Sequence, residues 1–241
     1  MKTCHSFNVN FNYCMKPPRI ALIHATPLAV SPINDSFKSL WPQAICQNLL
    51  DDSLSVDLAR EGELTQAMIK RFLKLTHYTL SAGADAILFT CSAFGVAIEA
   101  CAKESNVPVL KPNEAMFDEA LSLARTGVRL KVALLATFNP SIPSMSEELN
   151  QMAKARAIDL DLLTAHVPDA MQHLANGDAQ KHHDLIAQTA AHLPPCDVIL
   201  LAQFSMAAAK ETVSAALKNP NLPVLSSPAC AVQALQKALL N

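Results

Sequence analysis

The chain has 241 residues and a net charge of −2, enough for one large or two small domains. Its lysines and arginines are scattered, which argues against a nucleic-acid interface, and no apolar run reaches the roughly 18 to 20 residues of a membrane span. Its seven cysteines are odd in number and form no C-x-x-C pair, which predicts reduced thiols in a cytoplasm rather than disulfides or a zinc site.

Apolar runs alternate with helical patterns from Arg19 onward, which predicts βαβ units and parallel sheets. Residues 1–18 are expected to be an N-terminal extension without a secretory leader. We expect strands at 20–25, 44–50, 86–90, 107–110, 132–137, 160–165, 198–202 and 222–225. Helices are expected near 33–40, 63–81, 94–104, 114–125, 144–156, 178–192, 205–218 and 229–240. Ser144 and Glu147 have capping-box spacing, and Gly83 and Gly177 are expected to end helices.

An internal repeat relates the two halves of the chain: a shift of 112 residues aligns them without a gap. The shift places 20–22 on 132–134, Asp57 on Asp169 and 85–88 on 197–200, and after a three-residue insertion 106–110 falls on 221–225. The sequence therefore predicts an α/β fold of two pseudo-symmetric lobes, each with a mainly parallel four-stranded sheet flanked by helices, and an active site in the cleft between them. We assign 19–113 to lobe 1, completed by 222–241, and 114–221 to lobe 2.

A thiol ends the third predicted strand. Thr90, Cys91 and Ser92 fall at its carboxyl end, the edge where open parallel sheets bind ligands. A helix amino terminus nearby would favour the Cys91 thiolate, although free cysteine is also among the most buried residue types. The shift puts Gln203 at the equivalent position of lobe 2, and an amide cannot move protons at neutral pH.

Other polar residues fall at the same predicted edge. His24 ends the first strand, where it would face the same cleft and hold a thiolate or shuttle a proton, or simply be a hydrogen-bonded histidine. The hydroxyl of Thr137 suits a substrate carboxylate. Ser92 and Ser205 start helices, as an anion site or as ordinary N-caps. Lys111 could neutralise a carboxylate or be solvated. No glycine-rich or metal-ligand motif occurs, so we expect no cofactor and no metal.

The repeat, with Thr90 to Gly95 closing the third strand, resembles the aspartate/glutamate/hydantoin racemase superfamily over about residues 18–241. The resemblance implies a cofactor-independent enzyme in which one cysteine from each lobe works across the substrate. One cysteine removes a proton from the carbon next to a carboxylate, and the other delivers a proton to the opposite face. Cys91 matches the first cysteine, whereas Gln203 stands in the place of the second.

Three reactions stay open under this resemblance. The protein is a racemase in which His24 or His166 replaces the second base, a one-thiol decarboxylase of a substituted malonate, or an isomerase with Cys91 as nucleophile. A non-catalytic carboxylate-binding protein is the alternative outside enzymes. Charge that develops on the carboxylate needs nearby donors, for which the candidates are Thr90, Ser92, Lys111, Thr137, Gln203 and Ser205. The expected partner is a small carboxylate, with no nucleic acid or membrane, and a homodimer is left open.

Overall fold

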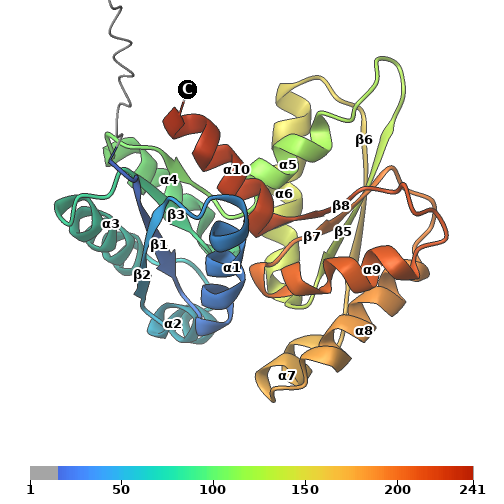
Figure 1. The fold of residues 1–241 in the computed structure, drawn as a ribbon, viewed down its shortest axis with the longest axis horizontal. Coiled ribbons are helices and arrows are strands. Elements are labelled where there is room, and N and C mark those ends of the chain that lie inside the picture. Colours follow the sequence, from blue (N-terminus) through green and yellow to red (C-terminus); the bar gives the residue numbers. More distant parts are fainter. Residues whose placement is uncertain (1–15, 241) are drawn as a thin grey trace, which may run out of the picture.

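Two four-stranded sheets form the core of the protein (Figure 1). The structure, a computed structural model, describes residues 16–240, so most of the predicted extension 1–18, with Cys4 and Cys14, lies outside the described residues. The strands are β1 Arg19–His24, β2 Ile45–Leu50, β3 Ala86–Phe89, β4 Val109–Leu110, β5 Leu130–Ala136, β6 Leu160–His166, β7 Val198–Leu201 and β8 Val224–Ser226. Sheet A has the order β2-β1-β3-β4 and sheet B the order β6-β5-β7-β8, with parallel pairing throughout. The predicted fold class is confirmed.

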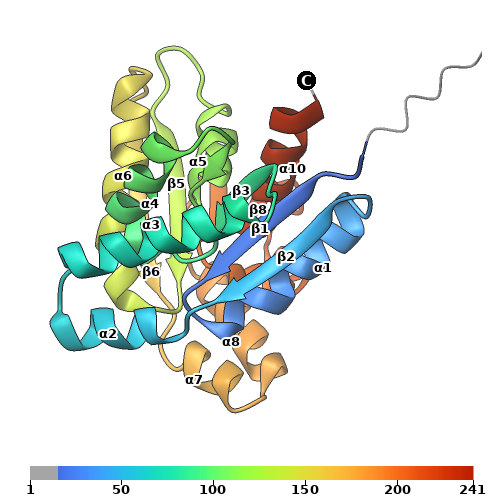
Figure 2. The same cartoon turned by 90° about the vertical axis from the view of Figure 1, so that its left-hand side faces the viewer.

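Helices cover both faces of each sheet (Figures 1 and 2). They are α1 Val30–Leu40, α2 Ser53–Glu61, α3 Gln66–Ser81, α4 Gly95–Glu104, α5 Glu114–Leu121, α6 Ile142–Ala155, α7 Ala170–Ala175, α8 Ala179–Ala191, α9 Lys210–Ala216 and α10 Ser227–Leu240. Sheet A lies between α1 with α10 on one face and α2, α3 and α4 on the other. Sheet B lies between α5 with α6 and α7, α8 and α9. Because both faces are covered, every residue of β3 and β7 is buried.

Short 3-10 turns follow the central strands at their carboxyl ends. They are η1 Pro27–Ala29, η2 Ser92–Phe94, η3 Asn139–Ser141 and η4 Phe204–Ala209. Each turn precedes a helix, so the chain leaves a strand and tightens before the helix begins. The predicted helix 205–218 is therefore divided into η4 and α9, and 94–104 begins as η2.

The repeat holds for the central strands. Ile20 pairs with Ala86 in sheet A and Val132 with Val198 in sheet B, so β1 and β3 match β5 and β7 at an offset of 112 residues. Val109 of β4 and Val224 of β8 are 115 positions apart in equivalent pairings, which confirms the three-residue insertion.

The edge strands break the gapless alignment. Cys46 of β2 and Leu162 of β6 pair with equivalent residues of β1 and β5, yet they are 116 positions apart. In lobe 2 the connection to β6 is thus four residues longer than the connection to β2 in lobe 1. The connection from β6 to β7 is four residues shorter than that from β2 to β3. Asp57, inside α2, is not equivalent to Asp169, which precedes α7. The prediction of a gapless repeat and of that pair is wrong, because connections to an edge strand can change length while the central pairing is kept.

Two helices were not predicted, α2 and α7. Both helices are short, and the polar residues around them are typical of loops. The capping box is also wrong, because α6 starts at Ile142 and the hydroxyl of Ser144 donates to the carbonyl of Ser141. Gly83 and Gly177 follow helix ends with φ of 80° and 83°, as predicted, because a left-handed residue is strained with a side chain.

The chain crosses between the lobes twice. β8 pairs with β7 in sheet B, so residues 222–226 belong to lobe 2 and not, as assigned from sequence, to lobe 1. The segment that returns is α10, whose Ala231, Val232 and Leu235 pack on sheet A. At the crossings, the buried hydroxyl of Ser227 donates to Oδ1 of Asn113 at 2.5 Å.

Lobe 2 also inserts a side chain into lobe 1. Phe204, the first residue of η4, is 3% exposed and packs in the same cluster as Ile20, Leu22 and Ala29. The lobes are therefore joined by apolar packing as well as by the chain.

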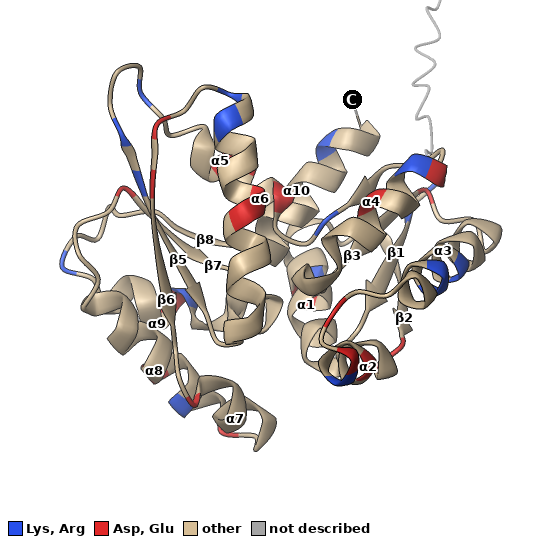
Figure 3. Cartoon of the chain, turned by 180° about the vertical axis from the view of Figure 1, so that it is seen from behind, with Lys and Arg blue, Asp and Glu red and all other residues tan. Residues whose placement is uncertain are grey.

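Figure 3 shows lysines and arginines spread over both lobes. Within residues 16–240, no helix combines the length and the apolar character that crossing a membrane requires.

Candidate active site

Cys91 and Gln203 occupy equivalent positions, two residues beyond the central strands β3 and β7. The turn η2 after Cys91 contacts α6 of lobe 2, and η4 after Gln203 contacts η1 and α1 of lobe 1. Both residues therefore border the junction between the lobes. That their side chains face each other across a cleft stays a prediction.

The thiol of Cys91 is packed into lobe 1. Ile87 and Phe89 enter the core beneath α2, α3 and α4, and Cys91 continues this alternation in extended backbone and packs against the same core. Burial raises the pKa of the Cys91 thiol, opposed by hydrogen bonds from the Ala93 backbone and the Ser55 hydroxyl. The expected net lowering of this pKa by a helix terminus is wrong, because η2 separates Cys91 from α4 and burial dominates.

The space beside Cys91 is narrow and mostly apolar. It admits no water molecule. Its other lining residues are Ile23, His24, Ala25, Leu54, Phe72 and Phe89. A negative charge on sulfur would therefore lack solvation on this side and would depend on hydrogen bonds from the protein.

His24 is fully buried and hydrogen-bonded at both ring nitrogens. Nε2 lies 2.9 Å from Oδ1 of Asn48, and Nδ1 lies 2.9 Å from the hydroxyl of Thr90. An amide oxygen only accepts, so Nε2 carries a proton and donates it to Asn48. The hydroxyl of Thr90 also lies 3.3 Å from the carbonyl oxygen of Ile23. Burial lowers the pKa of His24, which the Asn48 hydrogen bond opposes.

This histidine lies on the other face of sheet A from Cys91. Leu22 and Leu88 enter the core beneath α1 and α10, and His24 follows Leu22 in the strand alternation. Asn48, its partner, bonds to Asn34 of α1. The His24 ring is thus occupied by Asn48 and Thr90, although the residue also lines the narrow space beside Cys91. That His24 supports the Cys91 thiolate and that Thr90 binds a substrate stay predictions.

Gln203 is held within its own lobe. Its Oε1 accepts from both the backbone N–H and the hydroxyl of Thr137, each at 2.7 Å, and its Nε2 donates to the Ser141 hydroxyl at 3.3 Å. Thr137 is 4% exposed. Two of the three predicted substrate ligands of lobe 2 thus bind each other, and the amide is fixed in one orientation.

Lys111 forms an ion pair between the lobes. Its Nζ lies 2.8 Å from Oε1 of Glu148 on α6 and 3.3 Å from Oε1 of Glu99 on α4. Burial lowers the pKa of Lys111, but the carboxylates of Glu148, Glu114 and Glu99 outweigh it and the net pKa is raised. Burial raises the pKa of Glu148 despite its partner. Two protein carboxylates pair with Lys111 in this structure, and its predicted role towards a substrate carboxylate stays a prediction.

Lys111→Met is expected to lower the free energy of unfolding by about 2 kcal/mol at pH 8, less than a fully buried pair would lose, because Glu148 is left without its closest cation. Without Lys111 the folded pKa of Glu148 rises further above its unfolded value. A carboxyl group with a raised folded pKa makes its full contribution to stability at acid pH and loses it as the pH rises through the folded pKa. The difference in unfolding free energy between the native protein and Lys111→Met should therefore be smaller at pH 5 than at pH 8.

Urea unfolding at pH 5 and pH 8 measures this effect. Lys131→Met, at an exposed lysine of β5, is the matched control and should change little. A loss that is the same at both pH values, or equally large in Lys131→Met, would contradict the ion-pair explanation.

Ser92 and Ser205 lie in the turns next to Cys91 and Gln203. Ser92 is the first residue of η2 and half-buried, and Ser205 is the second residue of η4 and 8% exposed. Neither is an N-cap, because Cys91 and Gln203 occupy the cap positions. Their hydroxyls stay candidates for a carboxylate.

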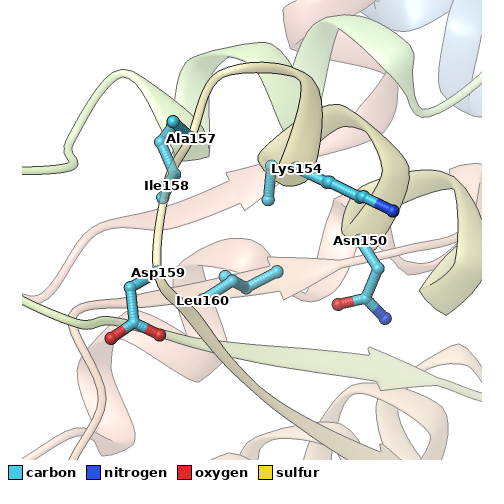
Figure 4. A pocket seen from close by; sticks show the side chains of 7 residues that line it. Asn150, Lys154, Ala157, Ile158, Asp159 and Leu160 are labelled. Atoms are coloured by element: carbon cyan, nitrogen blue, oxygen red, sulfur yellow. The ribbon is translucent and has the colours of Figure 1, made fainter.

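A shallow pocket of about 430 Å³ lies elsewhere, at the amino end of β6 (Figure 4). It is lined by Asn150, Ala153, Lys154, Ala157, Ile158, Asp159 and Leu160. In parallel sheets the ligand edge is the carboxyl end, so this pocket is not part of the candidate site. Among residues 16–240, no cluster of histidine, cysteine and carboxylate side chains could hold a metal ion.

Three residues of this region escaped the sequence analysis: Asn48, Ser55 and Glu148. Asn48 lies on an edge strand and Glu148 on a helix of the other lobe, so neither is near its partner in sequence. Ser55 lies on the unpredicted helix α2. The four-residue spacing of Leu54 and Leu58 on α2 is the signal that could have revealed this helix.

Several solved racemases share this fold. Glutamate racemase RacE1 from Bacillus anthracis has a TM-score of 0.67 at 13% identity, over 93% of this chain and 82% of its own. Aspartate racemase from Picrophilus torridus has a TM-score of 0.63 at 19% identity, over 91% of this chain and 93% of its own. Allantoin racemase from Klebsiella pneumoniae has a TM-score of 0.65 at 14% identity, over 93% of this chain and 88% of its own. No curated protein matches the sequence.

The sequence itself gives the family. The family model described as Asp/Glu/Hydantoin racemase matches residues 43–235, which is most of the chain and includes both Cys91 and Gln203. The same residues form most of the two sheets, so family and fold agree. The chain belongs to the Asp/Glu/hydantoin racemase family.

Proposed function

We propose that the protein is a cofactor-independent racemase-type enzyme that acts at the carbon next to the carboxylate of an amino acid or small carboxylate. The observation that carries this proposal is the place of Cys91, at the carboxyl end of a central strand and beside the junction of the lobes, in a chain of this family. An amino-acid substrate is supported by two of the similar structures, which are a glutamate racemase and an aspartate racemase.

Cys91 supplies the acid/base group in this proposal. As thiolate it removes the proton from the substrate carbon, and as thiol it returns one, so the sulfur gains and loses a single proton in each cycle. The raised pKa of the thiol suits the returning step, because the resting group carries the proton. Removal then requires donors that stabilise sulfur in the bound complex.

The substrate carboxylate is proposed to bind in the turns η2 and η4. Thr90 and Thr137 bond to His24 and Gln203, and Lys111 is paired with Glu148. Ser92 and Ser205, with the backbone N–H groups of their turns, therefore become the preferred donors to the charge that develops on the carboxylate.

The second face of the substrate is the unusual part. Gln203 cannot take or give a proton, and His24 is buried and doubly bonded. Of the two substitutes inferred from sequence, His166 stays open, because it is exposed at the carboxyl end of β6. We therefore propose fast proton exchange on the face served by Cys91 and slow two-way racemisation.

Deuterium wash-in tests the proposal. Each enantiomer of a panel of α-amino acids and hydantoins is incubated separately in D2O, and substituted malonates are assayed for loss of carbon dioxide. The expected result is rapid exchange from one enantiomer. Equal, rapid exchange from both would show a second base. Carbon dioxide loss without exchange from any amino acid would favour the one-thiol lyase, and no turnover of any compound would favour a binding protein.

Gln203→Cys is expected to raise exchange from the slower enantiomer by about 100-fold, because a thiol restores an acid/base group at the equivalent strand end. Gln203→Ser is the matched control, since serine has a similar size but cannot carry the proton near neutral pH. Both variants release Thr137 from its amide partner equally. If exchange rises as much in Gln203→Ser as in Gln203→Cys, the restored acid/base group is not the cause of the increase.

A further inference from the structure

A chain of hydrogen bonds runs from helix α1 to the carboxyl end of strand β3. Asn34 Nδ2 donates to the backbone carbonyl of Val30 at 2.7 Å and to Oδ1 of Asn48 at 2.9 Å. The same Oδ1 lies 2.9 Å from Nε2 of His24, whose Nδ1 lies 2.9 Å from the hydroxyl of Thr90. The network therefore links the helix to a buried histidine and to the end of the central strand.

The orientation of both amides follows from one backbone carbonyl. A carbonyl oxygen only accepts, so the end of the Asn34 amide that bonds to Val30 is its NH2 group. That NH2 group also needs an acceptor in Asn48, which turns the amide oxygen of Asn48 toward it. The reverse bond, from Nδ2 of Asn48 to Oδ1 of Asn34 at 3.2 Å, completes the pair. Because the oxygen of Asn48 is also the partner of His24, Nε2 of the ring carries a proton.

The Thr90 hydroxyl has two acceptors within reach. Its oxygen lies 2.9 Å from Nδ1 of His24 and 3.3 Å from the backbone carbonyl of Ile23. When Nδ1 carries no proton, the hydroxyl donates to the ring. When both nitrogens carry protons, Nδ1 donates to the hydroxyl oxygen, and the hydroxyl donates to Ile23 instead. Both ring nitrogens thus have partners in either state, although His24 is fully buried.

We propose that Asn48, anchored by Asn34, is a positioning residue that holds His24 as a proton acceptor at Nδ1. The Thr90 hydroxyl turns to the Ile23 carbonyl when that proton arrives. The proton comes from solvent and a new N–H bond forms at Nδ1, while Nε2 and the hydroxyl keep their own protons. A use of this proton in catalysis rests on the proposed function, whereas the position of the proton on the ring does not.

The ionisable neighbours of this histidine are few. Among the described residues that bond to the ring or line the narrow space with it, Cys91 alone is titratable. Asp51, which follows β2 beside His24, is paired with Arg71 of α3 at 2.6 Å. Helices α1 and α10 present Asn34 and apolar side chains to this face of the sheet. A change of charge at the amide partner is therefore expected to act on the ring directly.

A purely structural role predicts something different. If Asn48 only ties β2 to α1, replacing it changes the unfolding midpoint but leaves the proton of His24 on the same nitrogen. The position of that proton separates the two roles, because the hydrogen bond at one ring nitrogen decides which nitrogen is protonated.

The test is long-range 1H–15N correlation NMR of the intact protein labelled with 15N-histidine, with His24 assigned by its loss in His24→Gln. Burial lowers the pKa of His24 from its ordinary 6.5, so at pH 8 the native ring should carry one proton, on Nε2. Asn48→Asp should keep that proton and move the titration midpoint upward by about one pH unit, since a carboxylate beside the ring favours its charged form. Asn48→Lys offers a donor in place of the acceptor, so it should move the single proton to Nδ1 and lower the midpoint.

Gln47→Asp and Gln47→Lys are the matched controls, because Gln47 precedes Asn48 on β2 and points to the other face of the strand. A native proton on Nδ1 at pH 8, or equal midpoint shifts in the Gln47 and Asn48 variants, would overturn the inference. If His24 behaves as expected while Cys91 proves dispensable for turnover, the proposed function fails and the inference about Asn48 stands. If turnover needs Cys91 but the ring proton ignores both Asn48 variants, only this inference fails.

Discussion

Replacing Cys91 with serine is expected to lower proton exchange from the preferred enantiomer by about a thousandfold, because the hydroxyl cannot act as an acid/base group near neutral pH. The side chain is nearly the same size and packs at the margin of the core beneath α2, α3 and α4, so the fold should persist. Deuterium wash-in measures the exchange, and circular dichroism with thermal unfolding measures the fold.

A second thiol of the same lobe supplies the control. Cys46 of β2 is half-buried, and burial raises its pKa to about 11. It lies on an edge strand rather than at a central strand end. Cys46→Ser should therefore leave exchange unchanged. Full turnover in Cys91→Ser, or an equal loss in Cys46→Ser, would refute the assignment of Cys91.

Phe204→Ala should lower the free energy of unfolding by about 3 to 5 kcal/mol, the usual range for removing a buried phenylalanine. Phe204 belongs by sequence to the turn after β7 but packs in the core of lobe 1. Its removal therefore leaves a cavity where the lobes meet. Urea unfolding followed by circular dichroism measures the loss.

Phe138→Ala is the matched control for that substitution. Phe138 follows β5 in the same lobe but is 44% exposed, so its removal should cost less than about 1 kcal/mol. Similar losses in the two variants would mean that Phe204 does not join the lobes. A large loss in Phe204→Ala alone supports packing across the junction.

The central strands were predictable because they are buried on both faces. Such strands read as unbroken apolar runs, as at 86–89 and 198–201, and their pairing carries the repeat. The edge strands β2 and β6 contain only exposed and half-buried residues, and the connections to them differ in length between the lobes. The alignment therefore failed there, and with it the pairing of Asp57 with Asp169.

The strand ends that carry Cys91 and Gln203 were predictable, but the partners of the candidate site residues were not. The apolar runs place each of the two residues just beyond a central strand. Side-chain direction depends on the strand alternation, which turns His24 to the opposite face from Cys91. The partner of Lys111 lies 37 residues away on another lobe, and no local pattern indicates such a contact.

The return of α10 to lobe 1 has a consequence for synthesis. Residues 19–110 leave the ribosome before α10, a helix that covers Ile20 and Leu22. Lobe 1 therefore cannot complete the burial of that face until α10 has emerged, so it does not follow the usual order, in which the N-terminal unit folds first. Lobe 1 is therefore completed only after the strands of lobe 2 have been made.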